Sequence, residues 1–382
     1  MIGFQFIRTT RNGIHLSKSP SNALLPFLVC TLLFLFEGIS WSQKPGNPLT
    51  EKRARLTFGT DKSQIVRIVF YNTENFYDPY NDTTKLDDEF TAKGKKRWTY
   101  SKFSIKLTHL AKTLMALGEG GLPALIGLSE IENRYVMKKI VNESPLKKFR
   151  YRYVHYESPD ARGIDVALLY RPDLFTMISS RAIRIRFPSD TALKTRDILY
   201  VRGIFFHEDT IHVFVNHWPS KLGGISESES RRKYVASVLR KCVDTLFQKN
   251  PESNILIMGD FNDEPDQPSI NEVLGARPIH PGCRPDELVN LMCDKQQDWT
   301  HGTHKFQGKW TIIDQFMVSG SLIIKTSGLH ASPEDARIFN PDFLLEKETT
   351  FLGTKPLRTY AGPHYIGGFS DHLPIYLDIR KR

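Results

Sequence analysis

The sequence predicts an α/β domain in which two packed, mostly antiparallel sheets are flanked by helices. Strand-like segments are many and helix-like segments are few. Some strand-like segments alternate apolar and polar residues and others are apolar throughout, as expected when sheets pack on each other and beneath helices. In addition, five short apolar runs carry Asn, Asp, Glu or His at one end. Polar side chains at strand ends indicate a functional site at the edge of the sheets.

The N-terminal residues are expected to stand apart from this domain. Residues 1–42 contain basic residues, an apolar stretch at 23–36 and small residues before a cleavage point, which is the pattern of a signal peptide. The apolar stretch is shorter than the roughly 20 residues of a transmembrane helix, although an uncleaved N-terminal membrane anchor is the alternative. Residues 43–63 are polar and predict a flexible leader, so the domain is expected over residues 64–382.

Hydrophobic periodicity predicts the elements of the domain. Apolar residues at helical spacing predict helices over residues 102–117, 133–142 and 227–247. Strands are expected at residues 65–70, 125–128, 151–156, 165–170, 181–186, 198–206, 211–215, 254–258 and 373–377. Residues 321–365 are poorly periodic and contain several Gly and Pro, which predicts long loops near the mouth of the site.

The polar residues near the strand ends fall into short motifs. These are Y-N-T-E-N with Asn72, L-S-E with Glu130, N-H-W-P-S with His217, G-D-F-N-D with Asp260 and Asn262, I-D-Q-F with Asp314, and S-D-H with Asp371 and His372. A motif such as G-D-x-N is by itself also ordinary turn chemistry. Their joint occurrence at the ends of apolar runs favours a functional site.

These motifs, in this order, resemble the endonuclease/exonuclease/phosphatase superfamily, which has the DNase I-like fold. The resemblance covers about residues 64–382 and implies a four-layer α/β sandwich, in agreement with the periodicity. Within the family, N-H-W-P-S-K-L-G-G at residues 216–224 is most similar to the bacterial secreted branch of nucleases and phosphohydrolases. The resemblance does not specify a substrate.

A divalent metal is expected at the strand ends. A Glu carboxylate supplies the hard oxygen ligand that Mg²⁺ prefers, and Glu130 is such a residue. The resemblance implies that Glu130 is the principal ligand and that Asn72 and Asp371 complete or support the coordination sphere. We therefore expect Mg²⁺ or Mn²⁺ as cofactor. A capping or salt-bridging surface acid is the alternative for Glu130.

The remaining motif residues suit the hydrolysis of a phosphodiester. Asp260 would orient or deprotonate the attacking water, and Asn262 would hydrogen-bond a phosphate oxygen. With an unperturbed pKa of about 3.9, Asp260 is expected to be ionised at neutral pH and to need a metal-activated water. The resemblance implies that His372 contacts the scissile phosphate, that Asp314 fixes its ring, and that His217 assists proton transfer or charge stabilisation. Purely structural histidines are the alternative.

Further residues are candidates for substrate binding. Arg162, just before Gly163, and Arg231, after the N-H-W-P-S motif, stand where family members often place a phosphate contact. His301 and His304 match no motif, and as a pair they are more typical of a turn than of a metal site. Trp98, next to the basic residues 93–97, is available to stack on a base.

Net charge and cysteine content restrict which partners and which cellular compartment the protein can have. The formal charge of +10 becomes +8 without residues 1–42, because that segment carries three basic residues and one acidic residue. A basic surface suits a polyanionic substrate, although an ordinary soluble surface explains the charge equally well. In an exported protein Cys283 and Cys293 could form a disulfide, leaving Cys242 unpaired. No C-x-x-C pair is present, which disfavours a zinc site.

The sequence therefore predicts an exported enzyme, periplasmic or extracellular, that hydrolyses phosphodiesters of DNA or RNA with a divalent metal. One alternative is a phosphatase or phosphodiesterase acting on a sphingolipid, an inositol phosphate or another non-nucleic phosphoester, because loops rather than the core select the ligand. A catalytically inactive binding module on the same fold is the other. We expect a monomer without a stable membrane partner after cleavage of the signal peptide.

Overall fold

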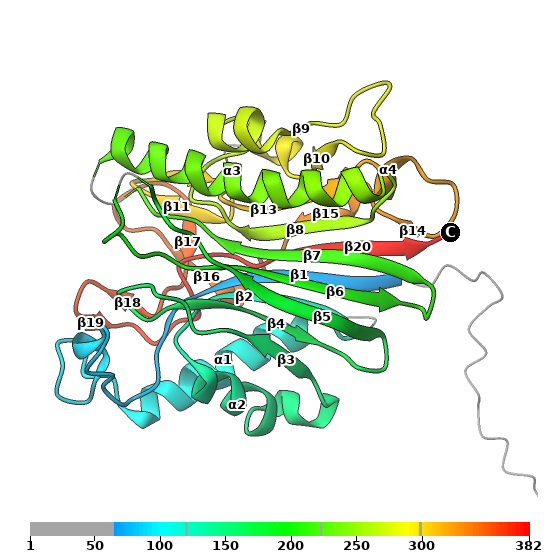
Figure 1. Ribbon diagram of the computed structural model, residues 1–382. Coiled ribbons are helices and arrows are strands. Elements are labelled where there is room, and N and C mark those ends of the chain that lie inside the picture. Colours follow the sequence, from blue (N-terminus) through cyan, green and yellow to red (C-terminus); the bar gives the residue numbers. More distant parts are fainter. Residues whose placement is uncertain (1–64, 119–120, 189, 222–223, 298–299) are drawn as a thin grey trace, which may run out of the picture. The chain divides into compact units, whose positions relative to one another are not determined.

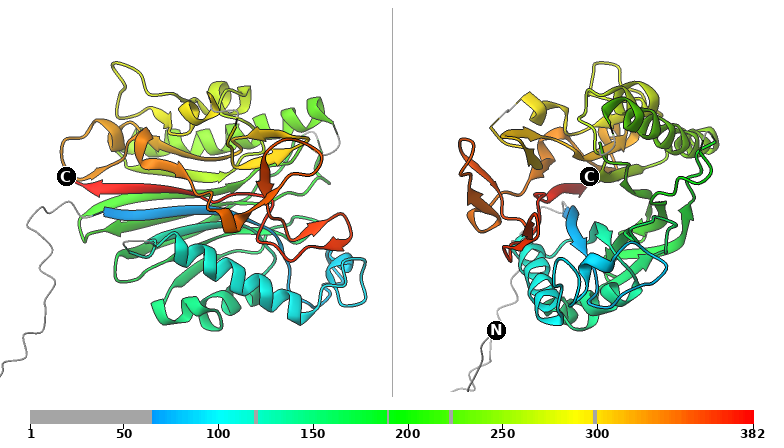
Figure 2. Two further views of the ribbon diagram at one scale, coloured as in Figure 1. Left: turned by 180° about the vertical axis from the view of Figure 1, so that it is seen from behind. Right: turned by 90° about the vertical axis from the view of Figure 1, so that its left-hand side faces the viewer.

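Two seven-stranded sheets pack face to face in the computed structural model, and helices cover their outer faces (Figure 1). The structure describes residues 65–382 apart from 119–120, 189, 222–223 and 298–299. The expected signal peptide and leader thus lie outside the described residues. The observed layers confirm the predicted α/β sandwich, and the two further views in Figure 2 show the sheets lying between the helical layers.

The first sheet is built around the strands that carry the Y-N-T-E-N, L-S-E and S-D-H motifs at their ends. Its order is β14 (Leu329–His330), β20 (Ile375–Lys381), β1 (Ile65–Phe76), β2 (Leu125–Ile131), β4 (Asp165–Tyr170) and β3 (Arg152–His155), with β15 (Ala336–Ile338) also paired to β20. Only β1 and β2 pair in parallel. Consequently Asn72 of β1 lies opposite Ser129 of β2, and the two motifs meet.

The second sheet carries the remaining motifs. Its order is β5 (Phe175–Ile183), β6 (Ile198–Phe205), β7 (Asp209–His217), β8 (Ile255–Asp260), β13 (Asp314–Ser319), β10 (Leu288–Asn290) and β9 (Ala276–Arg277). β7 and β8 run parallel and pair His217 with Asp260, while the antiparallel β13 pairs Asp314 with the same residue. Three motif side chains are therefore neighbours through strand register alone.

The strand sequences explain why both faces of each sheet are buried. In β1 the alternate residues Val66, Ile68 and Phe70 belong to the core between the sheets, whereas Val69 and Tyr71 pack beneath helices. Side chains alternate between the two faces of a strand, so an apolar run without polar gaps supplies two cores at once. This arrangement fixes the register that aligns the motifs.

Helices cover the outer faces as their apolar spacing predicts. α1 (Tyr100–Ala116) and α2 (Arg134–Asn142) pack on the first sheet, and α3 (Ile225–Lys249) packs on the second (Figure 1). Asn133, shortly after the L-S-E motif, caps α2: its side-chain oxygen accepts a hydrogen bond from the Val136 backbone amide at 3.1 Å. No helix within the described residues is long and apolar enough to cross a membrane.

Two expectations for local structure need correction. The strand expected at residues 181–186 ends at Ile183 and begins earlier, at Phe175. The segment 321–365 is not purely loop, because it contains α4 (Ser321–Ile324) and short strands besides β14 and β15. Within it, β16 (Leu345–Lys347) pairs with β17 (Thr354–Pro356), and β18 (Tyr360–Ala361) pairs with β19 (His364–Tyr365). A further short hairpin, β11 (His304–Phe306) with β12 (Lys309–Thr311), precedes the segment. Backbone pairing over two or three residues is too short to leave a readable period in the sequence.

Candidate active site

A buried hydrogen bond between motif residues joins β1 of the first sheet to β8 of the second. The Asn72 side-chain amide, at the end of β1, donates to Asp260 Oδ2 of β8 at 2.9 Å. Both side chains are almost completely buried. Around this bond lie the other motif residues, so a single site forms where the strand ends of the two sheets meet.

Four motif residues adopt the left-handed backbone conformation that non-glycine residues rarely take. These residues are Glu74 (φ 52°), Asn75 (φ 51°), Glu130 (φ 60°) and Asn262 (φ 51°). The register of β2 against β4 shifts between Ser129 and Ile131, so Glu130 stands on a β-bulge. A bulge re-aims a side chain, and strain of this kind concentrates at functional sites.

Glu130 presents one carboxylate oxygen to the centre of the site. Its Oε2 accepts a 2.6 Å hydrogen bond from the backbone N–H of Asn75, and this bond anchors the carboxylate. Oε1 lies 3.8 Å from His217 Nε2 and 4.0 Å from an Arg162 guanidinium nitrogen, beyond hydrogen-bond distance. With Asn72 and Asp260 nearby, the donors are hard oxygen atoms of the kind that bind Mg²⁺ or Mn²⁺. The residues at this position therefore fit a divalent metal.

Asp260 departs from the ordinary behaviour of an aspartate. Burial raises its pKa to about 7; the positive charge of His372 opposes this shift and the charge of Asp314 adds to it. The expectation of a carboxylate ionised well below neutral pH is thus wrong for the metal-free site. A divalent cation bound beside it would lower this pKa again.

His372 and Asp314 form a tight pair. His372 Nδ1 lies 2.7 Å from Asp314 Oδ2, and both side chains are buried. Burial alone would lower the pKa of His372, but the charges of Asp314 and Asp260 raise it well above its usual value. The ring nitrogen Nε2 lies 3.8 Å from Asp260 Oδ2 and faces the centre of the site. The ligand atoms of Asp260, Asp314 and His372 lie within 4.8 Å of one another, a spacing that could also hold a metal ion. The short bond between His372 and Asp314 instead indicates that these residues share a proton.

His217 has the opposite character. Burial, followed by the positive charges of Arg196 and Arg162, lowers its pKa well below the usual value, so the ring is neutral. Its Nε2 lies 3.5 Å from Asp260 Oδ2, while Nδ1 is buried without a hydrogen-bond partner. The structure therefore places one neutral and one charged histidine on Asp260.

Asp371 is held by an arginine that lies outside the motifs. Its Oδ2 accepts a 3.0 Å hydrogen bond from Arg358, and the same guanidinium lies 3.6 Å from Glu74. The described contacts thus tie Asp371 to Arg358 and do not join it to Glu130. Sequence analysis missed Arg358, which stands in no motif, and the pairing depends on the loop before β18 folding back onto the site.

The two arginine candidates separate in the structure. Arg162 lies beside Glu130, and its side chain is 41% exposed. Arg231 instead forms an ion pair with Glu227 along α3. The neighbouring Arg232 turns inward and binds Asp263 of the G-D-F-N-D motif at 2.7 Å. Helix α3 therefore supports the site through Arg232.

Two aromatic or imidazole side chains also differ from expectation. Trp98 is fully buried and donates its ring N–H to the Tyr77 carbonyl at 2.9 Å, so it is not available to stack on a base. His304 lies against His372 with ring centroids 4.8 Å apart. Burial and the charge of His372 lower the pKa of His304 to about 4. Its position arises from the β11–β12 hairpin, which the sequence pattern did not reveal.

A small basic cavity adjoins the site. It has a volume of about 180 Å³ and is lined by Glu74, Asn75, Phe90, Lys96, Arg358, Thr359, Tyr360 and Gly362. Lys96 Nζ lies 5.0 Å from the centre of the Tyr360 ring and donates to the Gly362 carbonyl at 2.7 Å. Asn75 links this cavity to the site, because it lines the cavity and its backbone amide donates to the Glu130 carboxylate.

Comparison with known proteins agrees with the resemblance in the motifs. The sequence matches the Endonuclease/Exonuclease/phosphatase family over residues 67–381. No protein in the curated set matches it. Among solved structures, zebrafish (D. rerio) TDP2 humanized by 14 mutations is 14% identical, with a TM-score of 0.50 over 82% of this chain and 98% of that one.

Two further structures have the same fold. The catalytic domain of human Nocturnin with bound sulfate is 14% identical, with a TM-score of 0.50 over 84% of this chain and 98% of that one. A family protein from Bacteroides thetaiotaomicron is 14% identical, with a TM-score of 0.50, and the match covers 84% and 96% of the two chains.

Proposed function

This chain belongs to the endonuclease/exonuclease/phosphatase family and is a metal-dependent phosphoric ester hydrolase, and we propose that it is an exported nuclease acting on DNA or RNA with Mg²⁺ or Mn²⁺. The observation that carries the proposal is the buried set of Asn72, Asp260, His372 and Asp314 beside the open oxygen of Glu130. Such a set combines a metal ligand, a base and a cationic side chain that can donate a hydrogen bond to the phosphate. Phosphodiester hydrolysis requires all three.

Each residue of the site has a distinct proposed task. Glu130 and Asn72 would hold a divalent metal, which when bound would supply an activated water and neutralise charge on the phosphoryl oxygens. Asp260 receives the proton of the attacking water. His372 donates from Nε2 to a phosphoryl oxygen, and Asp314 holds the ring in that orientation. Asp371 acts from a distance, by fixing Arg358 toward the substrate.

Two remaining side chains would complete the contacts to the phosphate. Asn262 donates one amide hydrogen to the Trp218 carbonyl at 3.0 Å, which leaves the second for a phosphate oxygen. Neutral His217, between Glu130 and Asp260, stabilises charge without adding a second imidazolium to the site.

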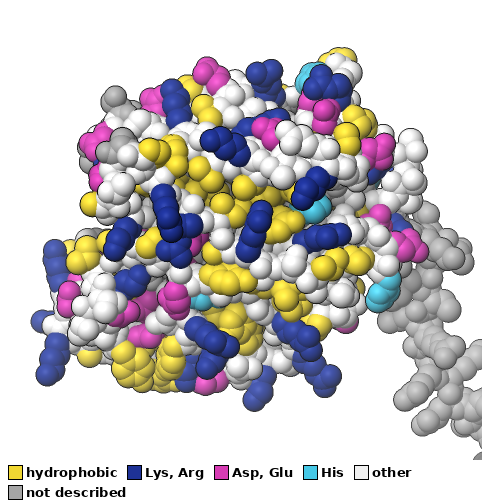
Figure 3. All heavy atoms as spheres, viewed as in Figure 1, with side chains coloured by type: hydrophobic (Ala, Val, Ile, Leu, Met, Phe, Trp, Pro, Cys, Tyr) yellow, Lys and Arg dark blue, Asp and Glu magenta, His cyan; other side chains and the backbone are white. Residues whose placement is uncertain are grey.

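The proposal of a nucleic-acid substrate rests on the cations around the site. Arg162 lies beside Glu130, and Lys96 and Arg358 line the adjoining cavity together with Glu74. On the face shown in Figure 3, by contrast, Lys and Arg side chains are spread among other residues and form no single patch. Local phosphate contacts therefore support a polyanionic substrate better than the overall charge does.

A substrate panel tests this function. The purified protein is incubated with supercoiled plasmid, RNA, sphingomyelin, an inositol phosphate and a generic phosphodiester, each with Mg²⁺ or with EDTA. We expect cleavage of plasmid or RNA with Mg²⁺ and none with EDTA. Activity confined to sphingomyelin or the inositol phosphate would replace the nuclease proposal, and inactivity on every substrate would favour a binding module.

Export and the bacterial secreted branch are part of the proposal because residues 1–42 have the composition of a signal peptide. N-terminal sequencing of the protein recovered outside the cytoplasm tests this. A chain that begins near residue 43 is the expected result. An intact N-terminus in the membrane fraction would instead support the anchor.

Binding of nucleic acid is expected to weaken with salt. Three phosphate contacts, from Arg162, Lys96 and Arg358, imply a loss of about fortyfold in affinity for duplex DNA between about 50 and 200 mM salt, because counterions are released on binding. Lys96→Met is expected to reduce the slope of log KM against log salt by about one. Lys95→Met is the matched control, since Lys95 does not line the cavity. A KM insensitive to salt would point to a small phosphoester.

The pH dependence of kcat/KM is expected to be bell-shaped. Asp260 must be ionised to accept a proton, so activity falls on the acid side as the pH drops through its pKa of about 7, or lower with metal bound. His372 must be protonated to donate, so activity falls on the alkaline side as the pH rises through its raised pKa. Asp314→Asn removes a charge that raises the pKa of His372, and the alkaline limb should move to lower pH. An alkaline limb that does not move would exclude His372 as its origin.

A further inference from the structure

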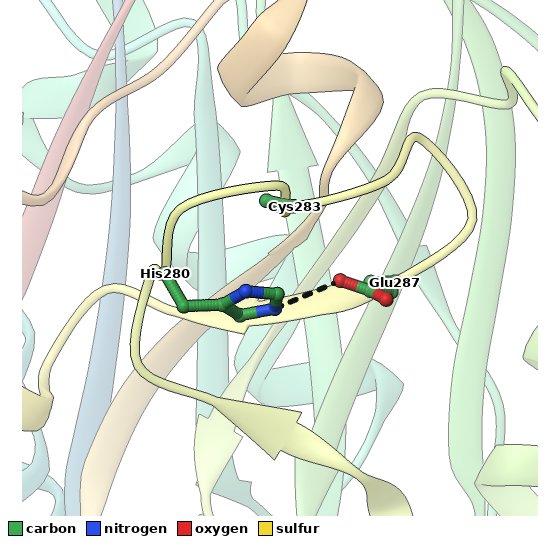
Figure 4. A group of neighbouring side chains, drawn as sticks. All are labelled: His280, Cys283 and Glu287. Carbon is green, nitrogen blue, oxygen red and sulfur yellow. Dashed lines mark hydrogen bonds and ion pairs between the residues drawn. The ribbon is translucent and has the colours of Figure 1, made fainter.

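Three metal-ligating side chains meet in a loop that the catalytic site does not use. His280, Cys283 and Glu287 lie between β9 and β10, and their ligand atoms are all within 4.8 Å of one another (Figure 4). The loop leads into Leu288, which pairs with Ser319 at the end of β13 opposite to Asp314. At about 3.4 Å per residue, the length of β13 separates this group from the catalytic pair by roughly 17 Å.

The orientation of His280 prepares its outer nitrogen for a cation. Nδ1 lies 3.0 Å from the Pro281 carbonyl, which can only accept a hydrogen bond, so Nδ1 carries a proton. In a neutral ring Nε2 then has a lone pair, yet it lies 3.0 Å from Glu287 Oε2. Two lone pairs cannot face each other at this distance, so a proton or a bound metal ion must lie between the two atoms.

The spacing suits a tetrahedral ion. Around Zn²⁺, with bonds of about 2.0 to 2.3 Å, neighbouring ligand atoms are about 3.3 to 3.6 Å apart. The 3.0 Å distance between His280 Nε2 and Glu287 Oε2 is already close to this value. Because all ligand atoms of the group lie within 4.8 Å of one another, Cys283 Sγ would have to move closer by only about an ångström. A turn at Gly282 (φ 82°) brings Cys283 back toward the other two.

The surroundings hold the proposed ligands in place. The Arg284 amide donates to Glu287 Oε2 at 3.2 Å, and the Arg284 guanidinium pairs with Oε1 at 3.1 Å. Ligating histidines and carboxylates in metal sites are oriented by such outer hydrogen bonds, here to the Pro281 carbonyl and from Arg284. Cys283 is a free thiol, as are Cys242 and Cys293, so the disulfide considered between Cys283 and Cys293 is not formed in the structure.

We propose that the loop of residues 278–287 is a zinc site in which His280 Nε2, Cys283 Sγ and a Glu287 oxygen bind the ion and water takes the fourth position. Binding releases the thiol proton, together with any proton held between His280 Nε2 and Glu287, to solvent, with no change in oxidation state. A mixed N, O and S set favours Zn²⁺ over Mg²⁺, which prefers oxygen alone. The ion would tie both ends of the β9–β10 loop together. The sequence criterion of a C-x-x-C pair could not detect this set because only one ligand is a cysteine.

Cobalt substitution provides the first test. Co²⁺ bound by a thiolate gives a near-ultraviolet charge-transfer band, and the described catalytic residues contain no sulfur. We expect the purified protein titrated with Co²⁺ to develop this band to one equivalent. Cys283→Ser should remove the band, whereas Cys293→Ser, the control at the nearby free cysteine, should keep it. Absence of the band, or a band that survives in Cys283→Ser, would overturn the proposal.

Zinc affinity provides the second test and separates this site from the catalytic metal. In a Glu130→Gln background, His280→Ala and Glu287→Gln should each weaken Zn²⁺ binding at least about tenfold. His330→Ala, at a buried histidine of β14, is the control and should leave the affinity unchanged. His280→Ala in the otherwise native chain should retain Mg²⁺-dependent hydrolysis and its metal-free melting temperature. Equal zinc affinity in the ligand variants and the control would refute the assignment.

Discussion

Glu130→Gln is expected to lower kcat/KM by at least about a thousandfold, the equivalent of about 4 kcal/mol of transition-state stabilisation. A glutamine oxygen can still accept the 2.6 Å hydrogen bond from the Asn75 amide, so the segment keeps its conformation. The other oxygen, which faces His217 and Arg162, becomes an amide that cannot bind a cation. The loss therefore falls on the metal and not on the fold.

Activity as a function of Mg²⁺ concentration measures this effect, together with the melting temperature of the variant. Glu132→Gln is a matched control because burial raises the pKa of Glu132 to about 9, so the native side chain is already neutral at pH 7. Near-native activity is expected for that control. Full activity in EDTA, or an unaltered Mg²⁺ dependence in Glu130→Gln, would refute the metal site.

His372→Ala and Asp314→Asn are each expected to lower kcat by at least about a hundredfold, and the double variant should fall well short of the product of the two losses. The 2.7 Å bond between His372 and Asp314 is the reason. Once Asp314 is neutral, the ring loses the partner that keeps it protonated and directs Nε2 toward the phosphate. Removing the imidazole as well then costs little more.

Single-turnover rates for the four proteins of this cycle measure the coupling, and melting temperatures check that each variant folds. His330→Ala, a buried histidine on β14 at the other end of β20, should leave the rate unchanged. Multiplicative losses in the cycle would show that Asp314 acts only as a structural acid.

Local patterns in the sequence were sufficient for the architecture. Apolar runs such as residues 65–70 and 254–258 identified strands, because a strand buried on both faces must be apolar throughout. Polar residues directly after these runs identified strand ends, and the family match bears out the recognition. Helix α2 was located to within a residue because Asn133 caps it. Each of these signals lies within a few neighbouring residues.

The contacts within the site depended on the tertiary structure. Arg231 and Arg232 are adjacent in sequence, but successive residues of a helix point about 100° apart, and only packing on the second sheet decides that Arg232 faces Asp263. Trp98 lies in a basic segment, yet its ring fills the core beneath Tyr77.

The charges and pKa values of the site also depended on the tertiary structure. The sequence by itself determined which residues stand at the strand ends and which chemistry their types allow. Only the assembled sheets decided that Asp260 has a pKa near 7, that His217 is neutral and that His372 is charged. The physical reason is that a pKa reflects burial and charges from every element that surrounds the group. Asp314 is 58 residues from His372 and Asn72 is 188 residues from Asp260, so those surroundings exist only once the two sheets have packed together.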